Sequence, residues 1–142
     1  MSDFMQFMKV NKVQKENATY AATKYLKDED GNPLKWEIKP VTTRENNAIR
    51  NGCTKELQVT GKPGMYREKL DTDKYLAKLI CESVTYPDLN NADLQDSYGV
   101  MDAESLITEM IDDPGEYGEF AVFIQEYNGF IPLQEKVDEA KN

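Results

Sequence analysis

The residues of this chain best equipped for chemistry are carboxylates that occur in pairs. These pairs are Asp93 with Asp96, Asp112 with Asp113, and Glu116 with Glu119. Two neighbouring carboxylates can divide acid and base roles or hold a magnesium ion. Each pair falls at a predicted helix end, however, where the helix dipole stabilises acidic side chains. Chance pairs are also expected with 26 Asp and Glu in 142 residues. We therefore interpret the pairs as structural and predict neither a catalytic residue nor a metal site.

Histidine and cysteine usage narrows the chemistry further. The chain has no histidine, which removes imidazole ligands and the Ser-His and Cys-His nucleophile pairs. Its two cysteines, Cys53 and Cys81, are too far apart for a CxxC motif. Without histidine, two thiols cannot supply the four ligands of a structural zinc site. We predict buried free thiols.

The charge balance bears on partners and compartment. The chain carries 17 Lys and Arg against 26 Asp and Glu, giving a net charge of −9. This acidity argues against nucleic acid and anionic membrane surfaces as partners. Residues 1–13 lack a signal peptide's apolar run, and no segment approaches the ~20 apolar residues of a membrane span. We expect a soluble cytoplasmic protein.

The elements that must position these residues begin with a hairpin. Residues 34–39 alternate apolar and polar side chains, which is typical of a strand with one buried face. Residues 19–26 are rich in Tyr, Thr and Ala, and the turn formers of residues 28–33 separate the two segments. The acidic turn fails the EF-hand pattern, because its twelfth position is Lys39 rather than Glu. A β-hairpin over residues 19–40 is predicted.

The remaining elements are mostly short helices. Thr42 and Glu45 have the spacing of a capping box before a helix that ends near residue 50. Residues 55–70 favour a second hairpin around the turn at residues 61–64, or an ordered loop. Helices are expected to follow Asp71 or Thr72, Asn90 or Asn91, and Asp102, and a last one to span residues 116–127. The apolar residues predicted to form the core are Trp36, Ile38, Leu79, Ile107, Phe120 and Ile124.

These elements give an α+β fold that is helix-rich overall, in which an N-terminal β-hairpin packs with several short C-terminal α-helices. We expect one domain over residues 16–131, a flexible N-terminal arm over residues 1–15 and a flexible tail over residues 132–142.

The N-terminal arm is unusually apolar for a chain terminus. It concentrates Phe4, Met5, Phe7 and Met8, and such side chains adapt to irregular partner surfaces. The arm either binds a partner or folds back on its own domain, and the sequence leaves both interpretations open. On the last helix, the face opposite the apolar arc carries Glu119, Val122, Gln125 and Glu126. We hypothesise that Phe4, Phe7 and Met8 bind a partner, with Val122 as a further contact.

Several segments, in order, resemble the XkdN-like tail assembly chaperones encoded by phages and defective prophages of Bacillus and its relatives. The segments are FMKVN (7–11), LKWEIKPVT (34–42), CTKE (53–56), YPDLNNADLQDSYGVM (86–101), GEY (115–117) and EYNGF (126–130). The resemblance implies a non-enzymatic protein without a cofactor. Such a protein binds the tape measure protein during assembly of a contractile tail and is absent from the finished virion. No established binding residues come with the resemblance.

The resemblance also implies that many such chaperones have a longer product made by a programmed ribosomal frameshift, through which a tail tube protein becomes a second partner. Lys141 followed by Asn142 can be encoded by a run of adenines, on which ribosomes slip. Two alternatives stay open. One is a small acidic anti-repressor or DNA mimic, and the other is a metal-dependent hydrolase that uses the carboxylates from Asp112 to Glu119.

Overall fold

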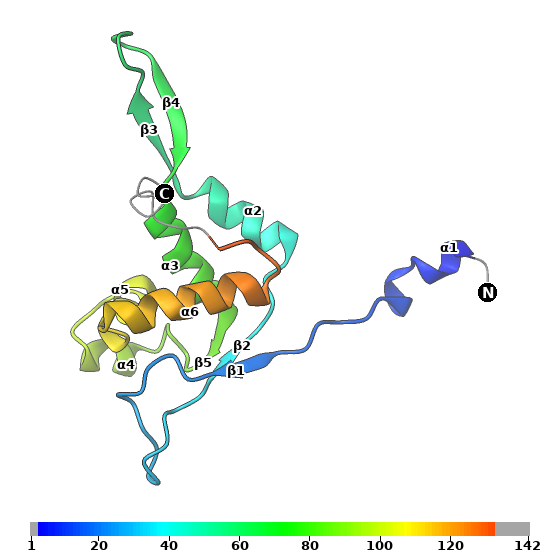
Figure 1. Cartoon of the computed structure of the whole chain (residues 1–142), viewed down its shortest axis with the longest axis vertical. Helices are drawn as coiled ribbons and strands as arrows, with labels where there is room; N and C mark the ends of the chain where they lie inside the picture. The colour runs from blue at the N-terminus through cyan, green and yellow to red at the C-terminus, as the bar shows by residue number, and fades with distance from the viewer. Residues whose placement is uncertain (1–2, 133–142) are drawn as a thin grey trace, which may run out of the picture.

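The computed structural model describes residues 3–132 and shows an α+β fold (Figure 1). The helices are α1 (Asp3–Gln6), α2 (Thr43–Asn51), α3 (Thr72–Ser83), α4 (Ala92–Ser97), α5 (Ala103–Met110) and α6 (Pro114–Tyr127), with a 3₁₀ turn η1 (Lys9–Asn11). The strands are β1 (Ala18–Tyr20), β2 (Trp36–Ile38), β3 (Thr54–Gln58), β4 (Tyr66–Leu70) and β5 (Val84–Tyr86). The predicted fold class is confirmed, and the predicted tail at residues 132–142 lies almost entirely outside the described residues.

The predicted N-terminal hairpin forms, with both strands shorter than predicted and one additional strand partner. β1 pairs antiparallel with β2, and Tyr20 lies opposite Trp36. β1 ends at Tyr20 rather than near residue 26, because the chain turns toward α6, where Thr23 and Lys24 bond to Glu116. β5 adds to the other edge of β2, giving the order β1-β2-β5. The sequence analysis missed β5, since three residues are too few to show an alternating pattern.

The second hairpin is also confirmed and forms a separate two-stranded sheet. β3 and β4 pair antiparallel in continuous register from Thr54 opposite Leu70 to Gln58 opposite Tyr66. Its turn uses positive φ values at Gly61 (77°) and Gly64 (83°), a conformation that glycine adopts without steric cost. The hairpin projects from the body of the molecule (Figure 1).

Side-chain caps explain where the helices begin. Thr42 and Glu45 form the predicted capping box at α2. The side chains of Asp71, Asn91 and Asp102 accept backbone hydrogen bonds at the starts of α3, α4 and α5. α6 begins at Pro114 rather than at residue 116, because Asp113 is its cap and proline is tolerated in the first turn.

The core lies between the three-stranded sheet and the helices. All six residues predicted to be buried are 2% exposed or less. Phe120 of α6 packs edge-on against Trp36, with ring centroids 5.6 Å apart, and stacks on Tyr20 at 5.4 Å. These contacts fix α6 against the sheet.

One assignment on α6 was wrong. Gln125, predicted on the solvent face, is buried, and its Nε2 donates a 3.0 Å hydrogen bond to the Ala121 carbonyl. α6 is covered over a wider arc than a single stripe, because both the sheet and α3 pack against it.

Candidate functional site

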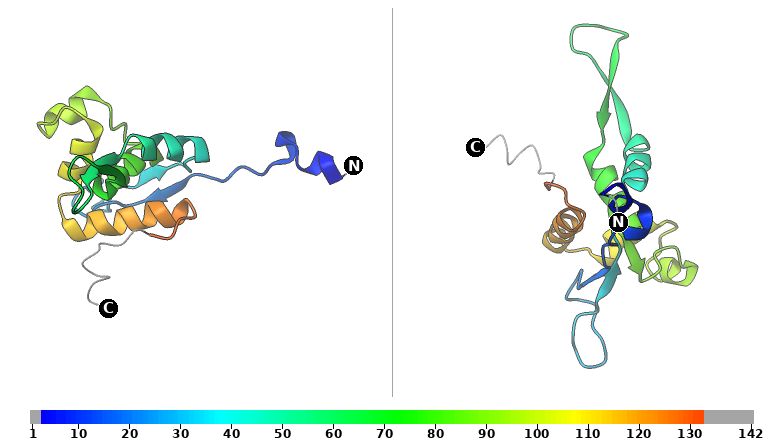
Figure 2. Two further views of the ribbon diagram at one scale, coloured as in Figure 1. Left: turned by 90° about the horizontal axis from the view of Figure 1, so that it is seen from above. Right: turned by 90° about the vertical axis from the view of Figure 1, so that its right-hand side faces the viewer.

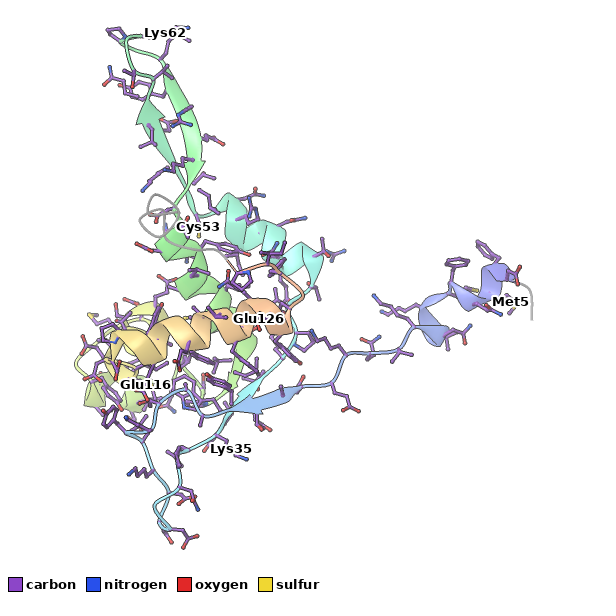
Figure 3. The ribbon with its side chains drawn as sticks, viewed as in Figure 1. Met5, Lys35, Cys53, Lys62, Glu116 and Glu126 are labelled. Atoms are coloured by element: carbon purple, nitrogen blue, oxygen red, sulfur yellow. The ribbon has the colours of Figure 1, made fainter. Side chains whose placement is uncertain are left out.

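The N-terminal arm, residues 3–15, extends away from the body of the molecule (Figures 1 and 2). Phe4 and Phe7 are 75% and 85% exposed, and Met8 is 48% exposed. The interpretation that the arm folds back on its own domain was therefore wrong. The apolar terminal segment, which includes the labelled Met5, is exposed to solvent (Figure 3).

Local hydrogen bonds organise the apolar part of the arm. The amides of Phe7 and Met8 donate to the carbonyls of Phe4 and Met5, at 3.0 and 3.1 Å. Asn11 also donates from its side-chain amide to the Met5 carbonyl, at 2.7 Å. These bonds hold Phe4 and Met5 within α1, and Phe7 and Met8 directly after its last residue. The arrangement suits recognition of an apolar partner rather than covalent chemistry.

The arm meets the body at α6. The Tyr127 hydroxyl donates a hydrogen bond to the Glu16 carbonyl, and the Lys15 ammonium lies 4.1 Å from the centroid of the Tyr127 ring. A tyrosine hydroxyl is protonated at neutral pH, and burial raises the pKa of Tyr127 further above its ordinary value. Tyr127 therefore fixes the point from which the arm departs.

Val122 lies apart from the arm. It is 39% exposed on α6, on the solvent side as predicted, and the exposed Glu119 and Glu126 share its helix. Phe4, Phe7 and Met8 lie within five positions of the arm, whereas Val122 belongs to α6, and the arm leads away from α6 (Figure 1).

Asp113 and Glu116, one member of each carboxylate pair at the start of α6, have structural partners. Asp113 Oδ1 accepts from the Gly115 amide at 2.9 Å. The two Glu116 oxygens accept from the Thr23 hydroxyl at 2.7 Å and from the Lys24 amide at 2.8 Å. Among residues 3–132, no group of three Cys, Asp or Glu side chains is arranged to hold a metal ion. The hydrogen bonds of Asp113 and Glu116 support the structural interpretation of these two carboxylates.

The two cysteines are free thiols. Cys53 is buried as predicted, whereas Cys81 is only partly shielded from solvent. Burial raises the pKa of Cys53, and it raises the pKa of Cys81 to about 12. Neither side chain is a ready thiolate nucleophile at neutral pH.

A charged junction that the sequence analysis missed joins β2, α2 and α3. Lys39 Nζ lies 3.3 Å from Glu45 Oε2 and 3.4 Å from Glu82 Oε1. The hydrogen bond between the two glutamates lowers the pKa of Glu45 to about 2 and raises the pKa of Glu82. The capping-box spacing pointed to Glu45, but no local pattern relates Lys39 to Glu82, 43 positions away. The junction holds elements together and lines no site.

Two further properties bear on partners. None of the helices within residues 3–132 combines the length and apolarity of a membrane span. The acidic loop after β1 is a turn, in which Asp28 Oδ1 accepts from the amides of Asp30 and Asn32, both at 2.9 Å. The predicted hairpin turn is thus confirmed, and the Asp28 carboxylate organises it.

Comparison with known proteins now adds to this description. Residues 4–141 match the family described as phage XkdN-like tail assembly chaperone protein. The chain is 28% identical over 141 residues to the phage-like element PBSX protein XkdN of Bacillus subtilis strain 168, covering 99% of this chain and 94% of the relative. It is 25% identical over 138 residues to the uncharacterized protein YqbN of the same strain, covering 97% and 91%.

The solved crystal structure of the protein YqbN has the same fold. It superposes with a TM-score of 0.75 over 92% of this chain and 99% of that one, at 21% identity. The family match spans the exposed arm, the sheet and all the helices from α2 to α6. The chain therefore belongs to the phage XkdN-like tail assembly chaperone family.

Proposed function

We propose that this protein binds the tape measure protein during assembly of a contractile phage tail, in the cytoplasm of the bacterial host, and is absent from the mature virion. The observation that carries the proposal is the exposed apolar arm, in which Phe4 and Phe7 lie almost entirely in solvent. A folded domain gains nothing from exposing two phenylalanines at its terminus, because their burial in a partner is worth about 1.5–3 kcal/mol each. Membership of a tail assembly chaperone family supports a tail protein as that partner.

The spacing of the arm residues suits an apolar helical or extended client. Phe4, Phe7 and Met8 have i, i+3, i+4 spacing, so their side chains would share one face if α1, which ends at Gln6, were extended to Met8 on a client. A four-residue helix such as α1 is marginal on its own in water, so a client that covers this face also stabilises it. Val122 is a separate apolar contact on α6, available to a client long enough to reach the body.

The acidity of the chain suits a solubilising role. A net charge of −9 gives a complex with an apolar client enough mutual repulsion to stay dispersed. The alternative of an anti-repressor or DNA mimic calls for ordered rows of carboxylates. An exposed aromatic arm is instead a feature of an apolar interface, so we favour the chaperone.

Co-expression tests the proposal. The tape measure protein from the same gene cluster is expressed alone and together with this chain, and its soluble fraction is measured. We expect the tape measure protein to become soluble only in the presence of this chain and to co-purify with a tag placed on it. Equal solubility with and without this chain, and no co-purification, would contradict the proposal.

A further inference from the structure

The N-terminal arm carries a charge opposite to that of the rest of the chain. After Asp3 it contains Lys9, Lys12 and Lys15, and the next acidic residue is Glu16. The arm thus holds three of the chain's 17 Lys and Arg and one of its 26 Asp and Glu, which leaves 14 against 25 in the rest of the sequence. The segment that exposes apolar side chains is therefore also the cationic segment of an acidic protein.

The 3₁₀ turn η1 brings two of these lysines to one side of the arm. The Lys12 amide donates to the Lys9 carbonyl at 3.0 Å and closes the turn. Side chains three positions apart eclipse in a 3₁₀ turn, so Lys9 and Lys12 lie on one side, about 6 Å apart along its axis. We call these two residues the cationic pair. Their like charges repel each other, and carboxylates from a partner would relieve the repulsion.

The cationic pair has no acidic partner in the part of the chain that the structure describes. Lys9 and Lys12 are exposed, and the ion pairs within residues 3–132 join only Lys39 and Lys78 to glutamates. Lys15 differs, because its ammonium lies over the Tyr127 ring and faces the body. The cationic pair is thus the free charge of the arm.

The arm holds the cationic pair away from the acidic body. Residues 12–17 leave the body as an extended segment (Figures 1 and 2). Six extended residues span up to about 20 Å, whereas the screening length at physiological ionic strength is about 8 Å. A partner that lies along the arm therefore meets the charge of the lysines more strongly than the charge of the body.

We propose that the arm recognises a client helix whose apolar stripe is bordered by carboxylates one turn apart. The apolar side chains of the arm cover the stripe, and the cationic pair binds the carboxylates. Helix side chains three or four positions apart lie about 5–6 Å from each other, which matches the separation of the two lysines. A strand fits less well, because its alternate side chains point to opposite faces. The inference rests on the proposed function, which makes the tape measure protein the client.

The charge distribution favours a helix over a membrane surface. A basic apolar segment can also bind an anionic bilayer. A helix is only about 10 Å wide and can lie along the arm clear of the body. A membrane plane would also face the body, whose surplus of acidic residues repels it.

Two designed peptides test the proposal. Both form amphipathic helices with the same leucine stripe, bordered by glutamate in one peptide and by lysine in the other. Fluorescence anisotropy of the labelled peptides measures their binding to the purified full chain. In about 0.1 M salt we expect the glutamate peptide to bind at least about tenfold more tightly, although a net charge of −9 by itself favours the lysine peptide.

High salt shows whether charge causes the preference. In about 1 M salt, where the screening length falls to about 3 Å, we expect the two peptides to bind equally. Equal binding in low salt, tighter binding of the lysine peptide, or no binding of either peptide would overturn the proposal.

Two matched variants localise the preference. Lys9→Gln with Lys12→Gln removes the cationic pair, and we expect the preference for the glutamate peptide to be lost. Lys27→Gln with Lys35→Gln removes two exposed cations from the β1–β2 connection, with the same change in net charge. We expect this control to keep the preference. An equal loss in both variants would assign the preference to net charge and overturn the proposal.

Capture of the tape measure protein on co-expression is a separate measurement. Capture by the wild type without a peptide preference would overturn this inference and leave the proposed function intact. A preference for the glutamate peptide without capture would contradict the proposed function alone. Vesicles of phosphatidylserine and phosphatidylcholine are the last probe, and we expect the chain not to co-sediment with them. Vesicle binding together with equal binding of the two peptides would assign the arm to a membrane surface and overturn the proposal.

Discussion

The Thr23 hydroxyl donates a 2.7 Å hydrogen bond to the Glu116 carboxylate across 93 positions of sequence. The second carboxylate oxygen accepts from the Lys24 amide at 2.8 Å, so one side chain in the first turn of α6 holds the chain that leaves β1. Thr23 is buried, and its hydroxyl has no access to bulk water as an alternative partner. Glu116 is therefore a link between the sheet and the last helix.

Replacing Glu116 with Gln should destabilise the fold. Thr23 and Lys24 donate to different carboxylate oxygens, and Gln replaces one of these oxygens with an NH₂ group, so at least one of the two bonds is lost. Losing a hydrogen bond to a charged group costs about 1.5–3 kcal/mol. The free energy of unfolding in urea measures the effect. Glu119→Gln, on the exposed side of the same helix, is the control and should stay within about 0.5 kcal/mol of wild type. Equal values for the two variants would show that the Glu116 link does not stabilise the fold.

Replacing Phe120 with Ala should cost about 3–5 kcal/mol, because the fully buried ring leaves a cavity between Trp36 and Tyr20. Thermal and urea unfolding measure the loss. Val122→Ala, two positions along the same helix but 39% exposed, provides the comparison and should have a small effect. Near-wild-type stability of Phe120→Ala would be incompatible with the packing of α6 described above.

Alkaline pH should weaken the fold through Tyr117. Burial raises the pKa of this phenol from 10.0 to about 12. The unfolded chain therefore loses the Tyr117 proton at a lower pH than the folded chain does. The contribution of the protonated phenol to the free energy of unfolding is fully present below pH 10 and is lost as the pH rises through 12. A pKa shift from 10.0 to about 12 corresponds to about 2.7 kcal/mol, which solvent screening at the half-buried Tyr117 reduces to about 2 kcal/mol. The free energy of unfolding, measured in urea, should fall less steeply between pH 10 and pH 12 for Tyr117→Phe than for wild type. An unchanged slope would contradict the prediction, and the exposed Tyr25→Phe serves as control.

Cys81 should resist thiol reagents in the folded state for the same physical reason. Its pKa of about 12 leaves almost no thiolate at pH 8, and the thiolate is the reactive form. We expect slow alkylation by iodoacetamide in buffer and rapid alkylation in urea, with modification mapped by mass spectrometry. Rapid labelling of Cys81 in the folded protein would contradict its shielding.

Local patterns predicted most of the fold, because caps and apolar periodicity depend on neighbouring residues. Thr42 with Glu45 marked the start of α2, and the spacing of Phe120 and Ile124 gave the buried side of α6. The burial of Gln125 was not predictable in this way. A polar side chain predicts an exposed position, whereas the sheet and α3 both cover this side of α6. The contact of Thr23 with Glu116 was equally out of reach, because it depends on tertiary structure.

The candidate site was predicted in composition but not in geometry. The cluster of Phe4, Phe7 and Met8 is apparent from sequence, whereas its direction relative to the body is not. That direction depends on the contacts of Tyr127 with Glu16 and Lys15, which join distant segments.

The proposed longer product is tested at the 3′ end of the gene. The codons of Lys141 and Asn142, which lie outside the described residues, should contain an adenine run followed by an open −1 frame. Mass spectrometry of protein made from the native gene cluster should then find a peptide that runs from Ala140 into the shifted frame. A gene without the run, or a −1 frame that stops within a few codons, would exclude a longer product arising there and the tail tube contact proposed through it.

Client capture by arm variants tests the central claim most directly. The tape measure protein is co-expressed with tagged wild type, with Phe4→Ser, Phe7→Ser and Met8→Ser combined, or with the control Val10→Ser and Val13→Ser. All five positions lie in the exposed arm, so thermal stability should be unchanged.

The amount of tape measure protein captured for each unit of tagged chain is the measurement. Loss of three apolar contacts predicts at least about a tenfold fall for the Phe4, Phe7 and Met8 variant. The control should capture as much as wild type. Equal capture by the folded triple variant would contradict the assignment of client binding to the arm.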